Sequence, residues 1–364
     1  MGFSWRKGLQ IAAFAMAACG GAHAQEQETA AKSRGPSFVA MPVPVSNPAL
    51  GNGLALTAIA LYSPGHSPQP WITGAGGLYT DSNSWAAAVF QRAHLAGDKV
   101  RVTAGVGVGD FKLDFYGIGS GAGARDRSIP IDQRGGGGLA QVLFKVAPNL
   151  YAGPVYRGIR TRTSLNLSEI PFPDMQIPEA ELRSESSGLG LAGEYDTRDA
   201  QFAPRKGVYA TGQWIRASQA LGSDRDYSRL ELAANFYHAL SDKAVAAGRV
   251  SFCDAGDRTP FYDLCLFGQN NDLRGYDAGR YRDHTMFAAQ VEYRRDLFWR
   301  IGAVAFAGVG NVAPSFDKLD GKLLPSAGVG LRFKASKSQR VNASVDFAFG
   351  DDSQAFYFYI GEAF

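Results

Sequence analysis

Apolar and polar residues alternate along several segments of the chain, and this alternation restricts the folds that it can adopt. In residues 326–334 and 341–349 the odd-numbered positions are apolar and the even-numbered ones are small or polar; residues 229–237 alternate with the same period. A period of two is that of a β-strand whose two faces meet different surroundings. Strands of a transmembrane barrel and strands of a soluble sandwich both meet this condition. The alternation alone therefore leaves both architectures open.

About sixteen such segments follow one another, and the lengths of their connections favour the barrel. We predict strands at residues 37–46, 53–62, 71–80, 84–95, 99–117, 136–147, 149–165, 184–197, 206–219, 226–240, 243–254, 283–297, 299–313, 322–335, 339–349 and 353–363. The long connections follow odd-numbered strands, and they are 118–135, 166–183, 255–282 and 314–321. Bacterial barrels have an even number of strands, with long loops on one rim and tight turns on the other. A sandwich has no reason to sort its loops by parity, so we predict an all-β fold, a transmembrane antiparallel β-barrel of about 16 strands over residues 37–364.

The first residues have the features of an export signal. Residues 1–24 contain a basic Arg-Lys pair, an apolar stretch over residues 9–18 and Ala22-His23-Ala24 as a cleavage site. The apolar stretch is far shorter than the ~20 residues of a membrane-spanning helix. We therefore predict a cleaved signal peptide, with lipoprotein processing at Cys19 as the alternative. Residues 25–36 are polar and predict a short disordered leader.

The net charge and the cysteine content limit which classes of partner and which cellular compartment fit the sequence. The net charge is only +3 and no basic stripe is present, which argues against a nucleic-acid partner. Of the three cysteines, Cys253 and Cys265 remain after the signal peptide is removed, twelve residues apart. In an oxidising compartment this spacing predicts a disulfide, and two separate buried thiols are the alternative.

The sequence gives no good sign of catalysis. The glycines of residues 105–109 lie inside a predicted strand, where small residues suit close packing better than nucleotide binding. Residues 117–121 contain no G-x-S-x-G motif, and the histidines that follow the signal peptide lack the spacing of metal ligands. We therefore predict no enzyme, no metal site and no cofactor.

Four segments, in order, resemble the outer-membrane assembly and secretion superfamily, which comprises BamA/TamA-type bacterial surface antigens and two-partner-secretion transporters. They are Glu194-Tyr195-Asp196-Thr197-Arg198-Asp199 with Pro204 and Gly207, Leu273-Arg274-Gly275-Tyr276, Gln290-Val291-Glu292-Tyr293-Arg294, and residues 306–312. The resemblance implies that the first is the turn between strands eight and nine and that Arg274 lies at the tip of the sixth extracellular loop. It also implies that the terminal Phe364 belongs to the signal that assembly machinery recognises.

In this family the sixth loop folds back into the lumen, and its Arg pairs with acids on the inner wall. The resemblance therefore implies a loop lock formed by Arg274, Gly275, Tyr276 and Glu292, and the parity of its strand points Glu292 inward. A solvated Arg274 is the alternative. Where the family has a second acid in the next strand this chain has Gly308, and Asp346, which is inward by the same parity, is a candidate replacement.

A second departure concerns the region ahead of the barrel. Relatives that assemble or secrete proteins carry periplasmic POTRA domains, but only 12 residues (25–36) separate the signal peptide from the first predicted strand. We therefore expect a barrel-only member in the outer membrane of a Gram-negative bacterium, linked to protein assembly or translocation. A passive pore or an outer-membrane enzyme is the alternative. The expected partners are outer-membrane lipids including lipopolysaccharide, the barrel assembly machinery during insertion, and a periplasmic or membrane protein.

Overall fold

The structure is a computed structural model that describes most of the chain after the predicted leader. The described residues are 37–47, 51–67, 69–124, 128–165, 183–200, 203–268, 272–277, 279–319, 321–336, 341–351 and 353–364. The predicted signal peptide, the leader and most of the connection at 166–183 lie outside them.

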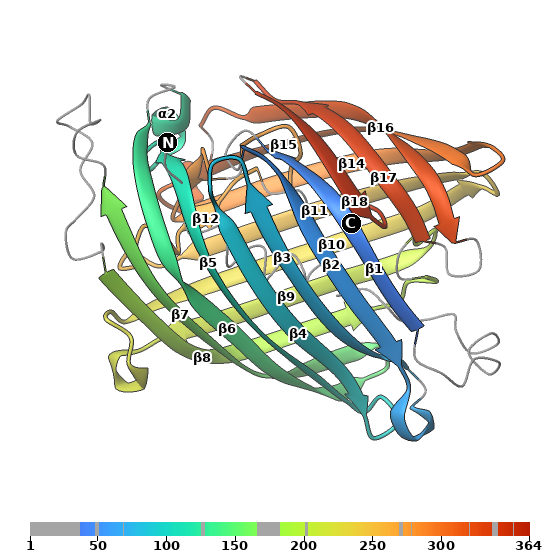
Figure 1. Cartoon of the computed structure of the whole chain (residues 1–364), viewed down its shortest axis with the longest axis horizontal. Helices are drawn as coiled ribbons and strands as arrows, with labels where there is room; N and C mark the ends of the chain where they lie inside the picture. The colour runs from blue at the N-terminus through green and yellow to red at the C-terminus, as the bar shows by residue number, and fades with distance from the viewer. Residues whose placement is uncertain are drawn as a thin grey trace.

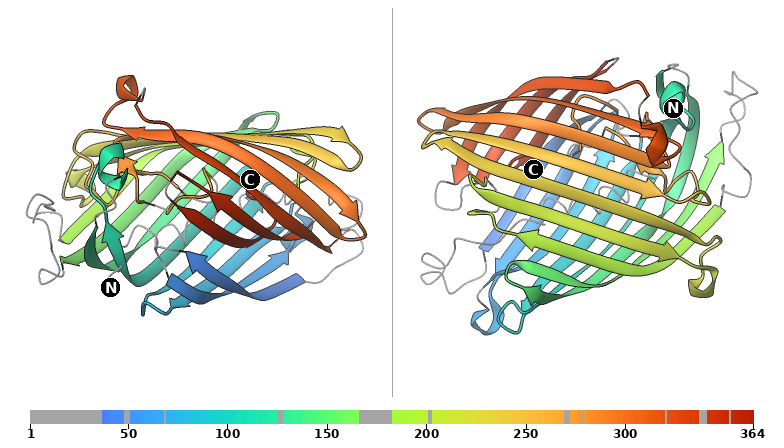
Figure 2. Two further views of the ribbon diagram at one scale, coloured as in Figure 1. Left: turned by 90° about the horizontal axis from the view of Figure 1, so that it is seen from above. Right: turned by 180° about the vertical axis from the view of Figure 1, so that it is seen from behind.

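Sixteen strands form one antiparallel sheet in chain order, rolled into a barrel (Figures 1 and 2). They are β1 (Ser37–Asn47), β2 (Gly51–Tyr62), β3 (Trp71–Thr80), β4 (Trp85–Leu95), β5 (Val100–Phe115), β6 (Ile129–Ala147), β7 (Leu150–Leu165), β8 (Arg183–Asp196), β9 (Gly207–Ala217), β10 (Tyr227–Ser241), β11 (Ala244–Ala255), β14 (Thr285–Phe298), β15 (Ile301–Ala313), β16 (Leu324–Ser336), β17 (Val341–Phe349) and β18 (Gln354–Ile360). The predicted strand number is confirmed.

The remaining elements are short and lie in connections. They are the two-residue strands β12 (Cys265–Leu266) and β13 (Arg282–Asp283), the helix α2 (Ser120–Ala124) and the 3-10 turns η2 (Pro64–His66), η5 (Gln219–Leu221) and η6 (Phe316–Lys318). No helix in the described ranges is long and apolar enough to cross a membrane.

Exposure along the strands distinguishes the barrel from a sandwich. On β14, Val291 is 63% exposed, whereas its neighbour Glu292 is 3% exposed. On β16, Val329 and Leu331 are likewise exposed while Arg332 is buried. An apolar outer face around a polar interior is the arrangement that lipid requires, and it is the reverse of a soluble core.

The first and last strands form a seam. Within the described part of the chain, β1 and β18 are the two ends of the hydrogen-bonded order, although they lie side by side (Figure 1). We call this junction the seam. Every other strand of the barrel is paired on both edges.

The last strand is shorter than the sequence predicts, because the predicted strand continues to residue 363. β18 ends at Ile360, and Gly361 adopts a positive φ of 94° that turns the chain. The carboxylate of Glu362 then accepts a hydrogen bond from Arg332 Nε (2.6 Å), and the Arg294 guanidinium donates to the backbone oxygen of Phe364 (2.9 Å). Charged partners on the inner wall therefore draw the last residues off the edge of the sheet.

Candidate functional site: the sixth loop in the lumen

Loop 6, residues 256–284 between β11 and β14, is the sixth of the connections that follow odd-numbered strands. Its described part is mostly buried, and it contains the small β12–β13 ladder. Its contacts reach opposite walls of the barrel. We therefore take loop 6 and the wall residues that it contacts as the candidate site.

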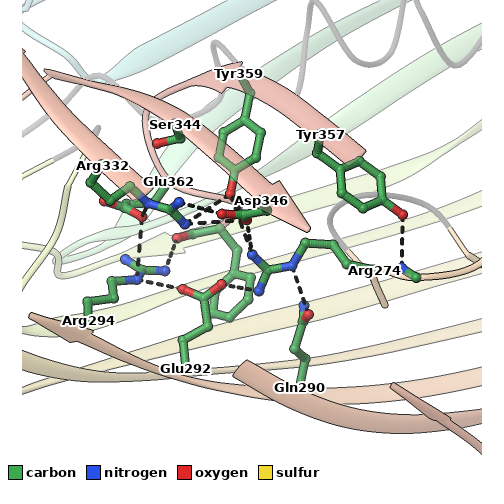
Figure 3. A network of polar contacts seen from close by, with 12 residues as sticks. Arg274, Gln290, Glu292, Arg294, Arg332, Ser344, Asp346, Tyr357, Tyr359 and Glu362 are labelled. Carbon is green, nitrogen blue, oxygen red and sulfur yellow. Dashed lines mark hydrogen bonds and ion pairs between the residues drawn. The ribbon is translucent and has the colours of Figure 1, made fainter. Parts of the chain in front are cut away.

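The tip of loop 6 carries a fully buried guanidinium. Arg274 is 0% exposed, and its two terminal nitrogens donate to the carboxylates of Glu292 on β14 and Asp346 on β17 (Figure 3). Its Nε donates to Gln290 Oε1 at 3.0 Å, and the guanidinium carbon lies 3.4 Å from the centre of the Phe306 ring. A buried guanidinium is tolerated when its donors meet carboxylates in this way. The structure thus brings Arg274 and Glu292 together, and it adds Asp346 as a second acid.

Arg274 belongs to a larger cluster of alternating charges. We call it the charge cluster, and its members are Arg274, Arg294, Arg332, Glu292, Asp346 and Glu362. Three cations face three anions, so the cluster is neutral although it is buried. Burial by itself would lower the pKa of Arg274, but Glu292, with Tyr359 and Asp346, raises that pKa above its ordinary value. Arg274 therefore remains charged, and the loss of any one partner would leave an uncompensated charge.

Gly275 connects the tip to the last strand. Its φ is 105°, and a Cβ there would lie 2.7 Å from the carbonyl carbon of Phe349, so a side chain would clash. Its N–H donates to the hydroxyl of Tyr357 at 2.9 Å, and its carbonyl accepts from Ser353 Oγ at 2.5 Å. Tyr357 lies in β18, and Ser353 is the residue directly before that strand. The loop tip therefore holds one strand of the seam from inside.

Tyr276 fixes the tip on its other side. Its hydroxyl donates to the carbonyl of Pro325 on β16 at 2.5 Å, and its ring meets that of Phe267 at 5.1 Å between centroids. The residue is buried. Tyr276 thus packs on the inner wall.

Gly308 explains the departure from the family pattern. A Cβ at this position of β15 would collide with Leu273 of the loop tip and would lie 2.6 Å from the carbonyl oxygen of Ala289. Gly308 therefore makes room for the loop at the position where the resemblance implies an acid. Asp346 supplies the second carboxylate from β17 instead.

A second anchor holds the first half of loop 6 on the opposite wall. Asp263 pairs with Arg157 of β7, accepts from the Tyr227 hydroxyl of β10 at 2.7 Å, and lies 3.8 Å from Arg229. All four side chains are buried or nearly so. The sequence alone does not indicate this anchor, because an acid in a loop is ordinary until the fold places two arginines against it.

Apolar packing accompanies the second anchor. Phe261 and Tyr262 of loop 6 join an inward-facing apolar cluster from the opposite wall. Its wall members include Phe111, Leu113, Phe115, Ile129, Ile131 and Ile159. This part of the interior is thus a packed core rather than a wetted surface. Apolar residues at alternate positions, at the end of β5 and at the start of β6, are the signal for this packing in the sequence.

A disulfide joins the start of loop 6 to the barrel. Cys253 at the end of β11 and Cys265 in β12 are bonded, with a sequence separation of 12. The bond and the Asp263 anchor act on the same half of the loop. The half that carries Arg274 follows Cys265 and lacks such a covalent attachment among the described residues.

We expect the disulfide to stabilise the barrel by limiting the unfolded chain. Closing a loop of this length contributes roughly 3 kcal/mol. Reductant should therefore lower the temperature at which the folded band is lost in gels of unboiled, heat-stepped samples. The Cys253→Ser/Cys265→Ser variant should lose its band at that lower temperature with or without reductant. An unreduced protein no more resistant than the double variant would contradict the expectation.

The predicted turn motif forms a compact charged turn between β8 and β9. Asp196 and Arg198 pair at 2.7 Å, and the Asp199 carboxylate accepts from two backbone amides across the turn at 2.8 and 3.1 Å. Pro204 is buried in the same turn, and Gly207 has a φ of 105°. These contacts are internal to the turn and its strands. They support a role in shaping this rim of the barrel.

In the described ranges no three His, Cys, Asp or Glu side chains form a group able to hold a metal ion.

The features that are present define a class: an outer-membrane barrel with an arginine-tipped loop folded into its lumen. Residues 147–364 match the Omp85 superfamily domain. The match covers more than half of the chain, and the protein belongs to this superfamily. Its members with this barrel are outer-membrane proteins of Gram-negative bacteria, and so is this chain.

Solved structures with the same fold include barrels from three bacteria. BamA from Haemophilus ducreyi lacking POTRA domains 1-3 is 14% identical over 90% of this chain and 69% of its own, with a TM-score of 0.58. CdiB from Acinetobacter baumannii is 13% identical over 89% and 59% (TM-score 0.58), and CdiB from Escherichia coli is 12% identical over 89% and 62% (TM-score 0.60). The chain thus spans less than two thirds of either CdiB. At these identities the likeness concerns the fold alone. Comparison with curated proteins finds no match.

Proposed function

We propose that this barrel assembles or translocates polypeptides at the outer membrane, and that the tip of loop 6 is an internal lock on its seam. One observation carries the proposal. The backbone of Gly275, next to the buried Arg274, is hydrogen-bonded to Tyr357 of β18 and to Ser353. Release of the tip would therefore free a seam strand that the sheet pairs on one edge only.

The alternatives fit the interior less well. A passive pore needs a wetted passage, whereas loop 6 here packs apolar and charged groups against both walls. Barrels of the superfamily are typically assembly or translocation proteins rather than enzymes. We accordingly expect no catalytic activity from this chain.

Proteins of the superfamily act with other outer-membrane assembly components and with lipids. For this chain we propose contacts with lipopolysaccharide around the apolar belt and with the barrel assembly machinery during insertion. Phe364 would serve as the signal that the machinery reads before the chain terminus turns into the lumen. We also propose a periplasmic or membrane protein partner that would deliver the polypeptide.

Loss of the protein should deplete particular polypeptides from the cell envelope. Quantitative proteomics would compare the outer membrane and culture medium of cells with and without it. We expect at least one outer-membrane or secreted polypeptide to fall severalfold and to return with the wild-type chain. Arg274→Ala, produced at the wild-type level, should not restore it. An unchanged protein profile accompanied by slower uptake of a small solute would contradict the proposal and favour the pore.

A further inference from the structure

The first strand of the seam contains two prolines. β1 has Pro42 and Pro44, and both side chains are exposed. Proline has no N–H, so inside a sheet it is tolerated where that position faces an unpaired edge. The direction in which these two nitrogens point therefore matters for the seam.

The neighbouring strands settle that direction. Asp81 N–H donates to the carbonyl of Asn52 at 2.8 Å, so the backbone groups of Asn52 in β2 face β3. Within a sheet, the backbone groups of the even-numbered residues of a strand bond to one adjacent strand, and those of the odd-numbered residues bond to the strand on the other side. The backbone groups of the odd-numbered residues of β2 thus point toward β1, and the register pairs these residues with odd-numbered residues of β1. Pro42 and Pro44 are even-numbered and face the seam.

The free edge of β1 consequently lacks hydrogen-bond donors at two successive positions. Edge positions recur every second residue, about 7 Å apart. The edge can accept bonds there but cannot donate them. Such an edge resists the addition of another strand, which is a known use of proline on exposed edges.

The edge of β18 has no such gap. Gly361 N–H donates to the carbonyl of Asn342 at 2.7 Å, so odd-numbered residues of this segment face β17. The even-numbered ones face the seam, and they are Gln354, Phe356, Phe358 and Ile360. Each carries both a donor and an acceptor. The two edges of the seam are therefore unequal.

We propose that the seam is one-sided: an extended polypeptide that enters it adds to the edge of β18, while Pro42 and Pro44 block backbone pairing along β1. The same prolines keep β1 and β18 from closing into a full ladder. The seam then depends on contacts from within, above all those of Gly275. The part of the inference that concerns an incoming polypeptide rests on the proposed function; the proline block does not.

Hydrogen exchange of the protein alone tests the proline block. Pro42→Ala/Pro44→Ala supplies the two missing donors, so β1 can pair with β18, and exchange of the β18 amides that face the seam should slow about tenfold. Pro154→Ala is the matched control, because Pro154 is exposed on β7, whose two edges are already paired. It should leave β18 unchanged. Equal exchange in the wild type and in a folded double variant would overturn the block.

Photo-crosslinking tests the incoming strand. A benzophenone side chain is placed at residue 40 of β1 or at residue 358 of β18, and the probe is a synthetic peptide of residues 354–364 of this chain. The peptide should crosslink at 358 severalfold more than at 40, and the double proline variant should gain crosslinking at 40. Equal yields at both positions in the wild type would overturn the one-sided seam. If exchange slows in the first experiment but the peptide crosslinks at neither position, the proline block is supported. The same result would contradict the proposal that polypeptides bind at the seam.

Discussion

Arg274→Ala is expected to destabilise the folded barrel by about 3–5 kcal/mol, because Glu292 and Asp346 each lose one of their two guanidinium partners and the buried charge cluster is left with three carboxylates against two cations. The same change frees the tip from the inner wall. The temperature at which the folded band disappears in heat-stepped gels should fall, and assembly yield should fall with it.

Four further variants test the charge of Arg274 and its geometry, and one of them is a surface control. Arg274→Lys keeps the charge but not the fork that meets two carboxylates, so it should be intermediate. Glu292→Gln should resemble Arg274→Ala, and the double variant should be less than additive. Arg160→Ala removes an exposed pair with Glu185 and should change little. Unchanged stability and yield in both Arg274→Ala and Glu292→Gln would mean that the lock does not exist in this barrel.

Asp263→Ala should have an effect of similar size at the other wall. It leaves the buried guanidinium of Arg157 without its carboxylate and removes the acceptor of the Tyr227 hydroxyl, at a cost of about 3–5 kcal/mol. Thermal unfolding followed in the same gels measures it. Because Asp263 lies before Cys265, the tip should stay in place, and the exchange of β18 amides should not change.

A matched pair tests this assignment. Asp263→Ala combined with Arg157→Leu removes both charges, so part of the lost stability should return. Arg274→Ala, in contrast, should speed exchange in β18. If Asp263→Ala speeds exchange in β18 as much as Arg274→Ala does, the loop moves as one body and the two anchors are not independent.

Local patterns explain which parts of the fold the sequence predicts. The strands and the sorting of their connections follow from a period of two and from turn positions, both of which are read within a few residues. The contact of Arg274 with Glu292 could be expected because a motif and a strand parity together point both side chains inward. Asp346 could be named as a candidate for the same reason.

Contacts that depend on which wall faces which loop residue could not be predicted. Asp263 meets Arg157 across 106 residues of sequence, and nothing near either residue indicates the other. The turn at Gly361 depends on Arg332 and Arg294, which the lumen provides only after β14 and β16 are in place. From the sequence, Gly308 indicated only that an acid was missing. In the structure, its lack of a side chain leaves space for Leu273.

Single-barrel conductance in planar bilayers tests the lock most directly. We expect the Arg274→Ala barrel to open to a larger and more frequent current than the wild type, while Arg160→Ala behaves like the wild type. Equal currents from the wild type and a folded Arg274→Ala barrel would contradict the claim that the tip of loop 6 closes this lumen.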